Sequence, residues 1–158
     1  MAAPAVQAAL EAVVARIEAI TPTIDATTAF ARKTIERVPS STRARKRLFD
    51  VDFEGVRDLS NEGSGVQAPA LADRVATFTV RIDYAAARAE RALELTMAVD
   101  AELVLRALGR SAGWAGTPVR RVVARASVER DQVEPAPGMG TGVLKLAVTA
   151  DVTYRDAE

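Results

Sequence analysis

Residues 142–156, GVLKLAVTADVTYRD, place apolar side chains on one side of an extended chain and mostly polar ones on the other. The apolar side of this segment includes Leu144, Val148 and Tyr154. Because successive side chains of a strand point to opposite faces, the pattern predicts a long strand with one buried face. The opposite, more polar face is a candidate subunit interface. Its polar residues are Lys145, Thr149, Asp151, Thr153 and Arg155.

Three earlier segments alternate in the same way, at residues 47–55, 74–84 and 119–130. The first two are separated by turn-forming residues at 60–70, so we expect them to pair as a hairpin. The third is joined to the last strand by a Pro/Gly-rich stretch at 131–142, which predicts a second hairpin with a long tip.

Two segments carry apolar residues at the three- and four-residue spacing of an amphipathic helix. The first covers residues 4–20 and is ended by Pro22, which disfavours helical geometry in the residue before it. The second covers residues 85–109, where Gly109 is a plausible stop. Asp100 lies inside the second segment and is a candidate cap for a fresh helix, which would divide the segment in two.

The second helical segment has an additional apolar stripe made by Leu95, Val99 and Leu103. A helix that packs one face on a sheet should carry polar residues on its far side. We therefore expect this stripe to be covered, either by residues 23–46 or by a neighbouring subunit. The three residues are candidate subunit-interface positions.

Residues 23–46 leave two structures open, a short helix from Asp25 or an irregular arm. The loop that follows holds the densest cluster of cations in the chain. Short basic runs sometimes contact phosphate backbones, although most are solvated loops. The candidate contacts with DNA or a partner are Arg43, Arg45, Lys46 and Arg47, together with Arg120, Arg121 and Arg125 of the third strand. These last three arginines alternatively pair with Glu129 and Asp151 across the sheet.

The elements follow the order α-β-β-α-β-β. This order predicts an α+β fold, with a four-stranded, largely antiparallel sheet and both helices packed on one face. A chain of 158 residues is most simply a single domain. We divide it into an N-terminal helix at 1–22, a basic arm or loop at 23–46 and a sheet-and-helix core at 47–158.

The composition removes several classes of enzyme. The chain has no cysteine and no histidine, which excludes Ser-His and Cys-His hydrolysis and zinc binding through those side chains. Its 21 basic and 21 acidic residues give no net charge, so no overall field attracts nucleic acid or membranes. No segment is apolar over the roughly 20 residues that a membrane span needs. We expect a soluble protein made in the cytoplasm, with no cofactor.

Three acids alternate on one face of the first strand: Asp50, Asp52 and Glu54. Carboxylate oxygens suit magnesium or calcium, so these residues could form a hard-cation site in an enzyme. Alternating acids on a solvent face are also routine in sheets, and a metal site needs more converging oxygens than one strand provides.

Several stretches together resemble the tail terminator family of long-tailed bacteriophages. They are the first helix ending in ITPT, the strand RLFDVDFEG, the passage TVRIDYAAARAERALELTMAVDAELVLRAL, and the terminal pair VRRVVARASVER and LKLAVTADVTYRD. The resemblance covers most of the chain. Residues 23–46 depart from it, because this region is longer and more basic than the family pattern.

The resemblance implies a structural virion protein without catalytic activity. Such proteins form a ring, typically of six copies, that closes the tail tube and presents the surface that joins the head. The implied partners are other copies of the chain, the major tail tube protein, a head-tail connector or stopper protein, and DNA that passes without sequence recognition. The implied location is the neck end of the virion tail, with assembly in the host cytoplasm. Two alternatives remain, another neck protein such as a stopper and a nucleic-acid-binding adaptor.

Overall fold

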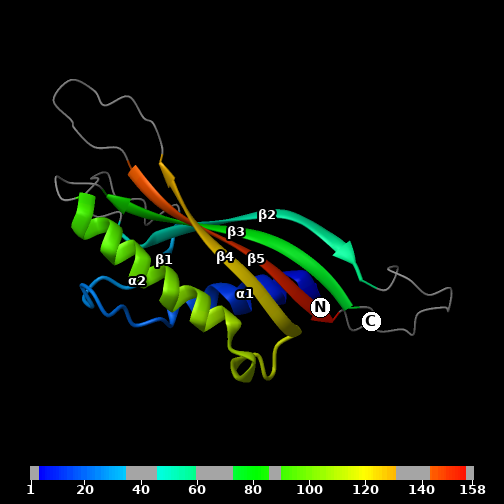
Figure 1. Ribbon diagram of the computed structural model, residues 1–158. Coiled ribbons are helices and arrows are strands. Elements are labelled where there is room, and N and C mark those ends of the chain that lie inside the picture. Colours follow the sequence, from blue (N-terminus) through cyan, green and yellow to red (C-terminus); the bar gives the residue numbers. More distant parts are fainter. Residues whose placement is uncertain (1–3, 35–45, 60–72, 86–89, 131–142, 156–158) are drawn as a thin grey trace, which may run out of the picture.

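The computed structural model describes residues 4–34, 46–59, 73–85, 90–130 and 143–155. Two α-helices, a short 3-10 helix and five strands lie within these ranges (Figure 1). In chain order they are α1 (Ala5–Glu18), β1 (Ala31–Arg32), β2 (Leu48–Asp58), β3 (Asp73–Ala85), α2 (Glu90–Gly109), η3 (Ser111–Gly113), β4 (Val119–Arg130) and β5 (Val143–Arg155).

The strands form one five-stranded sheet in the order β1-β2-β3-β5-β4. The pairs β2–β3, β3–β5 and β5–β4 are antiparallel, whereas β1 is parallel to β2. The α+β class and both predicted hairpins are confirmed. The prediction of four strands is corrected to a mixed sheet of five, because residues 31–32 add a short parallel strand beside β2.

The last strand of the chain, β5, lies inside the sheet between β3 and β4, and it pairs with β3 along its whole length. This register sets the apolar rows of the two strands side by side, for example Phe78 with Ala150 and Val80 with Val148. All four of these side chains are buried. The alternation that marks the strand in the sequence therefore provides the central layer of the core.

The two helices contribute to the same hydrophobic core as the strands. In α1 the buried apolar residues include Val13 and Ile17, and in α2 they include Met97, Val104 and Leu108. The contacts of the helices differ, because α2 packs mainly against β4 while α1 contacts β5, β1 and α2.

Helix α2 is continuous through Asp100, so the prediction that this residue caps a separate helix is wrong. Its carboxylate is fully buried and accepts hydrogen bonds from Arg47 and Tyr84, which leaves it no capping role. The predicted end at Gly109 is confirmed. The part of the predicted helix at residues 86–89 lies outside the described residues.

Residues 23–34 are not helical, so of the two structures left open for this segment, the short helix from Asp25 is excluded over the described residues. Asp25 has a φ of 54°, in the left-handed region, and its carbonyl accepts a hydrogen bond from the Thr28 amide. The chain then joins the sheet, because the amides of Ala31 and Lys33 donate to the carbonyls of Arg47 and Phe49.

Candidate assembly interface

Both edges of the sheet are open over long stretches of the described structure. Strand β4 is the last strand on one side. On the other side, β1 pairs only with Leu48 and Phe49, so no described strand pairs with the outer edge of Asp50–Asp58. Unpaired backbone amides and carbonyls along an edge strand can bind a strand of another chain.

The exposed apolar side chains gather at these two edges. Among the described residues, the large apolar side chains that are exposed are Phe53, Val56, Leu95, Val123 and Val128. The first two belong to β2 and the last two to β4, and the remaining one belongs to α2, which packs against β4. Apolar groups concentrated at sheet edges indicate a contact surface.

The burial of apolar side chains ends abruptly at β2, as the neighbouring rings of Phe53 and Phe78 show. The two rings are neighbours, with centroids 5.8 Å apart, yet Phe78 is 1% exposed and Phe53 is 57% exposed. A register shift between Phe53 and Gly55 sets Val56 opposite Ala76, on the same side of the sheet as the two rings. Strand β2 therefore continues its apolar row beyond the part of the sheet that the helices cover.

The three alternating acids of β2, Asp50, Asp52 and Glu54, each bind a different partner. Asp50 forms an ion pair of 2.7 Å with Lys33, Asp52 pairs with Arg81, and Glu54 accepts a hydrogen bond from Thr79. In the described part of the chain, no group of three or more acidic side chains is placed to hold a metal ion. These acids form an exposed acidic row on the outer side of β2. By outer side we mean the face of the sheet that points away from the hydrophobic core.

Lys33 links this acidic row to a buried carboxylate. Its ammonium lies 2.8 Å from Asp83, which is almost fully buried in β3, and 2.7 Å from Asp50. Burial alone would lower the pKa of Lys33, but the hydrogen bonds to the two carboxylates outweigh it and raise the pKa above the ordinary value. The ion pairs hold the residues after β1 against the sheet.

Two arginines of β4, Arg121 and Arg125, lie on the same outer side of the sheet. In the β4–β5 register Arg121 and Arg125 stand opposite Thr153 and Thr149, and both arginines are exposed. Arg120 is exposed as well, and occupies the register irregularity next to Arg121.

The alternative in which these arginines pair with Glu129 and Asp151 is wrong. Glu129 instead pairs with Arg81 at 3.1 Å, and Asp151 accepts a hydrogen bond of 2.6 Å from Thr77. Neither Arg121 nor Arg125 forms an ion pair with a described residue. Their charges are therefore available on the outer side of the β4 edge.

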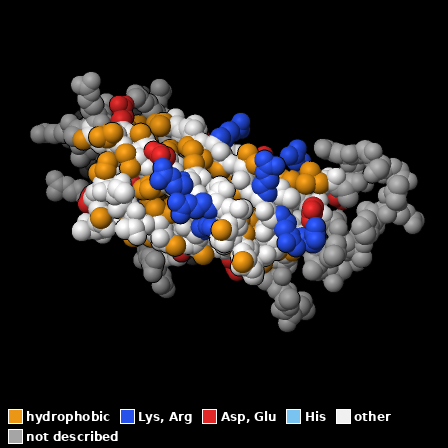
Figure 2. All heavy atoms as spheres, turned by 60° about the horizontal axis from the view of Figure 1, so that its bottom comes forward, with side chains coloured by type: hydrophobic (Ala, Val, Ile, Leu, Met, Phe, Trp, Pro, Cys, Tyr) orange, Lys and Arg blue, Asp and Glu red, His pale blue; other side chains and the backbone are white. Residues whose placement is uncertain are grey.

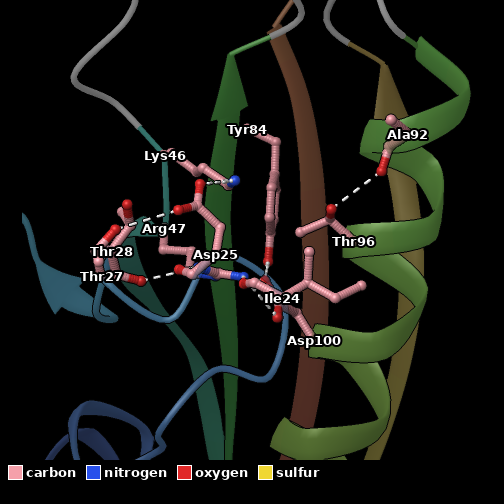
Figure 3. Close-up of polar contacts among 10 residues, drawn as sticks. All are labelled: Ile24, Asp25, Thr27, Thr28, Lys46, Arg47, Tyr84, Ala92, Thr96 and Asp100. Atoms are coloured by element: carbon pink, nitrogen blue, oxygen red, sulfur yellow. Dashed lines mark hydrogen bonds and ion pairs between the residues drawn. The ribbon is translucent and has the colours of Figure 1, made fainter.

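Arg47 does not contact DNA or a partner through its side chain, which corrects the prediction for this residue. Its side chain is fully buried and forms an ion pair with Asp100 at 2.6 Å (Figure 3). The backbone of Arg47 has a φ of 60° in the turn before β2, and its amide donates to the Asp83 carbonyl. The guanidinium points into the protein, toward Asp100 of α2.

All five N–H donors of the Arg47 guanidinium are engaged, which is what a buried arginine requires. Two of these hydrogen bonds reach the carboxylate of Asp100. The other three go to the carbonyls of Ile24, Asp25 and Thr28. The residue thus ties the segment before β1 to helix α2, and its role is structural.

The other cations of the predicted cluster have different surroundings. Lys46 forms an ion pair with Asp25 at 2.6 Å, and this hydrogen bond is the main reason that the pKa of Asp25 is lowered. Arg43 and Arg45 lie outside the described residues.

Tyr84 donates its hydroxyl to Asp100 at 2.7 Å and is fully buried. Burial first, and the adjacent Asp100 carboxylate second, raise the pKa of Tyr84 far above its ordinary value. An unfolded tyrosine ionises near pH 10, roughly, so above that pH the unfolded chain loses a proton that the folded chain keeps. Stability is therefore unaffected below the unfolded pKa and declines above it.

We expect the free energy of unfolding to fall by up to about 1.4 kcal/mol per pH unit above the unfolded pKa through Tyr84 alone. The measurement is urea unfolding of the wild type and of Tyr84→Phe between about pH 8 and about pH 11. The variant should lose stability less steeply than the wild type. Parallel curves for the two proteins would contradict this assignment.

The second apolar stripe of α2 is uncovered only in part. Leu95 is 61% exposed, whereas Val99 and Leu103 are half-buried. Among the described residues, Leu103 lines a hollow between the end of α1 and α2. The hollow also contains three arginines, Arg16, Arg106 and Arg110. Figure 2, which brings the lower side of Figure 1 forward, shows basic side chains clustered among apolar ones.

Arg16 is fixed at the rim of this hollow. Its guanidinium lies 4.0 Å from the ring centroid of the buried Trp114 and donates a hydrogen bond to the Arg110 carbonyl. Partial burial, and then the nearby charge of Arg110, lower the pKa of Arg16. This basic surface is not evident in the sequence, because Arg16 is far along the chain from Arg106 and Arg110.

The more polar face of β5 remains a predicted subunit interface. Its candidate residues are half-buried: Lys145, Thr149, Asp151, Thr153 and Arg155. Arg155 pairs with Asp73 at 2.9 Å, which lowers the pKa of that carboxyl and raises the pKa of the arginine. Thr149 lies 3.5 Å from the hydroxyl of Thr79. This face is therefore a row of cross-strand polar contacts in the centre of the sheet.

No protein-family model matches the chain, and no curated protein matches it. None of the described helices combines the length and the apolar character needed to cross a membrane.

Proposed function

We propose that the chain is a structural virion protein that forms a ring, closes the tail tube of a long-tailed bacteriophage and presents the surface that joins the head. The observation that carries the proposal is the pair of open sheet edges on opposite sides of the molecule, both with exposed apolar side chains. A protein with two different contact surfaces can bind a copy of itself on each side.

The direction of the edge strands favours such an arrangement. Strand β2 is antiparallel to β3, β3 to β5 and β5 to β4, so β2 and β4 run in opposite directions. A second copy placed beside the first in the same orientation brings its β2 next to β4 as an antiparallel neighbour. A head-to-tail contact of this kind builds a closed ring when the rotation between copies closes.

Other surfaces would serve the remaining partners. The hollow lined by Arg16, Arg106 and Arg110 gives the helix side a basic surface for an acidic partner, such as the tube protein or a head-tail connector. The balanced charge of the whole chain suits a passage through which DNA slides without being held. The expected ring has six copies, and the expected place is the neck end of the virion tail.

The genes beside that of this chain provide the first test, since genes for the tail tube and for head completion are expected there. The direct test mixes the purified full-length chain with tubes assembled from the neighbouring tube protein. Electron microscopy should reveal a cap at one end of each tube, and capped tubes should join to filled heads. Tubes that remain bare at both ends would contradict the proposal.

A nucleic-acid-binding adaptor is the alternative from another class. Fewer of its candidate cations can contact DNA, because Arg47 is buried and Lys46 is paired with Asp25. The exposed arginines of β4 still favour it. An adaptor would bind DNA with an affinity that falls steeply with salt, and absence of binding at low salt would exclude it. Another neck protein, such as a stopper, would form a ring that binds heads but leaves bare tubes uncapped.

A further inference from the structure

We infer that the acidic β2 edge of one copy pairs with the basic β4 edge of the next, so that the antiparallel sheet continues from copy to copy. The partner is a second copy of this chain, and the inference rests on the proposed ring because both require self-assembly. It specifies which two surfaces meet, in which direction the strands run and which charges are opposed.

Charge complementarity on the outer side of the sheet is the first reason. The outer side of β2 carries Asp50, Asp52 and Glu54, all exposed, followed by Arg57 beyond the register shift. Asp50 and Asp52 also pair with Lys33 and Arg81 within the copy, so Glu54 is the acid without an ion pair in the described residues. The outer side of β4 carries Arg121 and Arg125, also exposed and without an ion pair among the described residues. When two copies stand side by side in the same orientation, their outer sides coincide, so these acids and arginines face each other across the junction. Opposite charges in neighbouring strands stabilise the pairing.

The inner side of the sheet provides the second reason. There β2 exposes Phe53 and Val56, and β4 exposes Val128 beside the partly buried Ala124 and Ala126. These residues share the core side of the sheet with buried neighbours such as Phe78 and Leu146. When Asp52 stands opposite Arg125, the same orientation places Phe53 opposite Ala124 of the next copy, so the junction continues the apolar row of the sheet.

A symmetric contact is disfavoured by the same charges. Two β4 edges would bring arginines together, and two β2 edges would bring carboxylates together. Like charges directly opposite each other destabilise strand pairs and suppress wrong partners. The two edges are thus matched to each other and not to themselves, which is the condition for a head-to-tail contact.

Charge-reversed variants of the full-length chain test the inference. The first variant combines Asp52→Arg with Glu54→Arg, and the second combines Arg121→Glu with Arg125→Glu. Each variant alone opposes like charges at every junction, so each should be a monomer by mass photometry and light scattering. An equal mixture contains only matched junctions when the two variants alternate, so it should recover the mass of the wild-type assembly with an even number of copies.

A matched control carries two charge reversals on the helices, Glu11→Lys and Glu102→Lys. It should assemble like the wild type, and circular dichroism should show that all variants are folded. The inference is overturned if either edge variant keeps the wild-type mass, if the mixture stays monomeric, or if the wild type is a monomer at the highest soluble concentration.

Disulfide trapping identifies the register independently of charge, since the chain has no cysteine of its own. Mixing Asp52→Cys with Arg125→Cys under oxidising conditions should give a cross-linked pair, whereas either variant alone should not. Absence of a cross-link from this pair and from Glu54→Cys with Arg121→Cys would also count against the inference.

The failure of the junction and the failure of the tail function can be told apart. An edge-paired ring that leaves tail tubes bare would retain the junction and reject the tail function. If the charge-reversed variants still cap tail tubes, the tail function would be retained and the edge-to-edge junction rejected.

Discussion

Replacing Asp100 with alanine is expected to lower the free energy of unfolding by about 3–5 kcal/mol, the usual cost of removing one partner of a buried ion pair. The guanidinium of Arg47 would remain fully buried with two of its hydrogen bonds lost. The hydroxyl of Tyr84 would lose its acceptor as well. Urea unfolding followed by circular dichroism measures the change.

Glu102→Ala is the matched control, because this acid lies two residues further along α2 and pairs with Arg106 at an exposed site. An exposed pair of this kind contributes well under about 1 kcal/mol. A combined replacement, Arg47→Met with Asp100→Leu, leaves no buried charge unpaired, but it should also destabilise the protein. It removes the donor to the carbonyls of Ile24, Asp25 and Thr28, and it removes the acceptor of the Tyr84 hydroxyl. Equal effects of Asp100→Ala and Glu102→Ala would contradict the structural role of the pair.

Phe78→Ala and Phe53→Ala should have opposite consequences, although the two rings are neighbours. Removing the buried ring of Phe78 leaves a cavity in the core and should cost about 3–5 kcal/mol of unfolding free energy. Removing the exposed ring of Phe53 should change the stability of the monomer by less than about 1 kcal/mol. The exposed ring is instead required at the junction between copies, so Phe53→Ala should weaken assembly.

Thermal unfolding and mass photometry of both variants separate the two effects. A loss of stability in Phe53→Ala as large as that in Phe78→Ala would mean that Phe53 belongs to the core of the monomer. An unchanged assembly of Phe53→Ala would remove the apolar part of the proposed junction.

Much of the fold could be predicted from the sequence because its strongest signals are local. Alternation over ten or more residues marks the long strands, and β4 has the bounds that its alternation predicts. The helical spacing likewise located α1 and the end of α2 at Gly109. These patterns arise within single elements, so no knowledge of tertiary contacts is needed to identify them.

The sheet order and the fifth strand could not be predicted in the same way. Strand β1 has two residues, too few for any alternation, and it exists because Arg47 and Lys33 anchor the surrounding segment. Arg47 looked like one member of a basic loop. Its partner Asp100 is 53 residues away in the sequence, and only the folded chain brings the two together.

The candidate interface was predicted in part for a related reason. Alternation tells which face of a strand a residue occupies, but not how far the helices cover that face. The alternation at 47–55 places Phe53 on the apolar side of β2, yet this side chain is exposed. Arg121 and Arg125 of β4 are evident in the sequence, but the sequence does not show that they form no ion pair with a described residue, because it does not reveal that Glu129 pairs with Arg81.

Native mass spectrometry of the purified full-length chain, over a range of concentrations and at low salt, tests most directly whether the protein builds a ring through two different edges. We predict one discrete closed species, of six copies, that dissociates as salt increases because charges at the junction are screened. A protein that remains monomeric at every concentration, or that stops at a symmetric dimer, would contradict the ring.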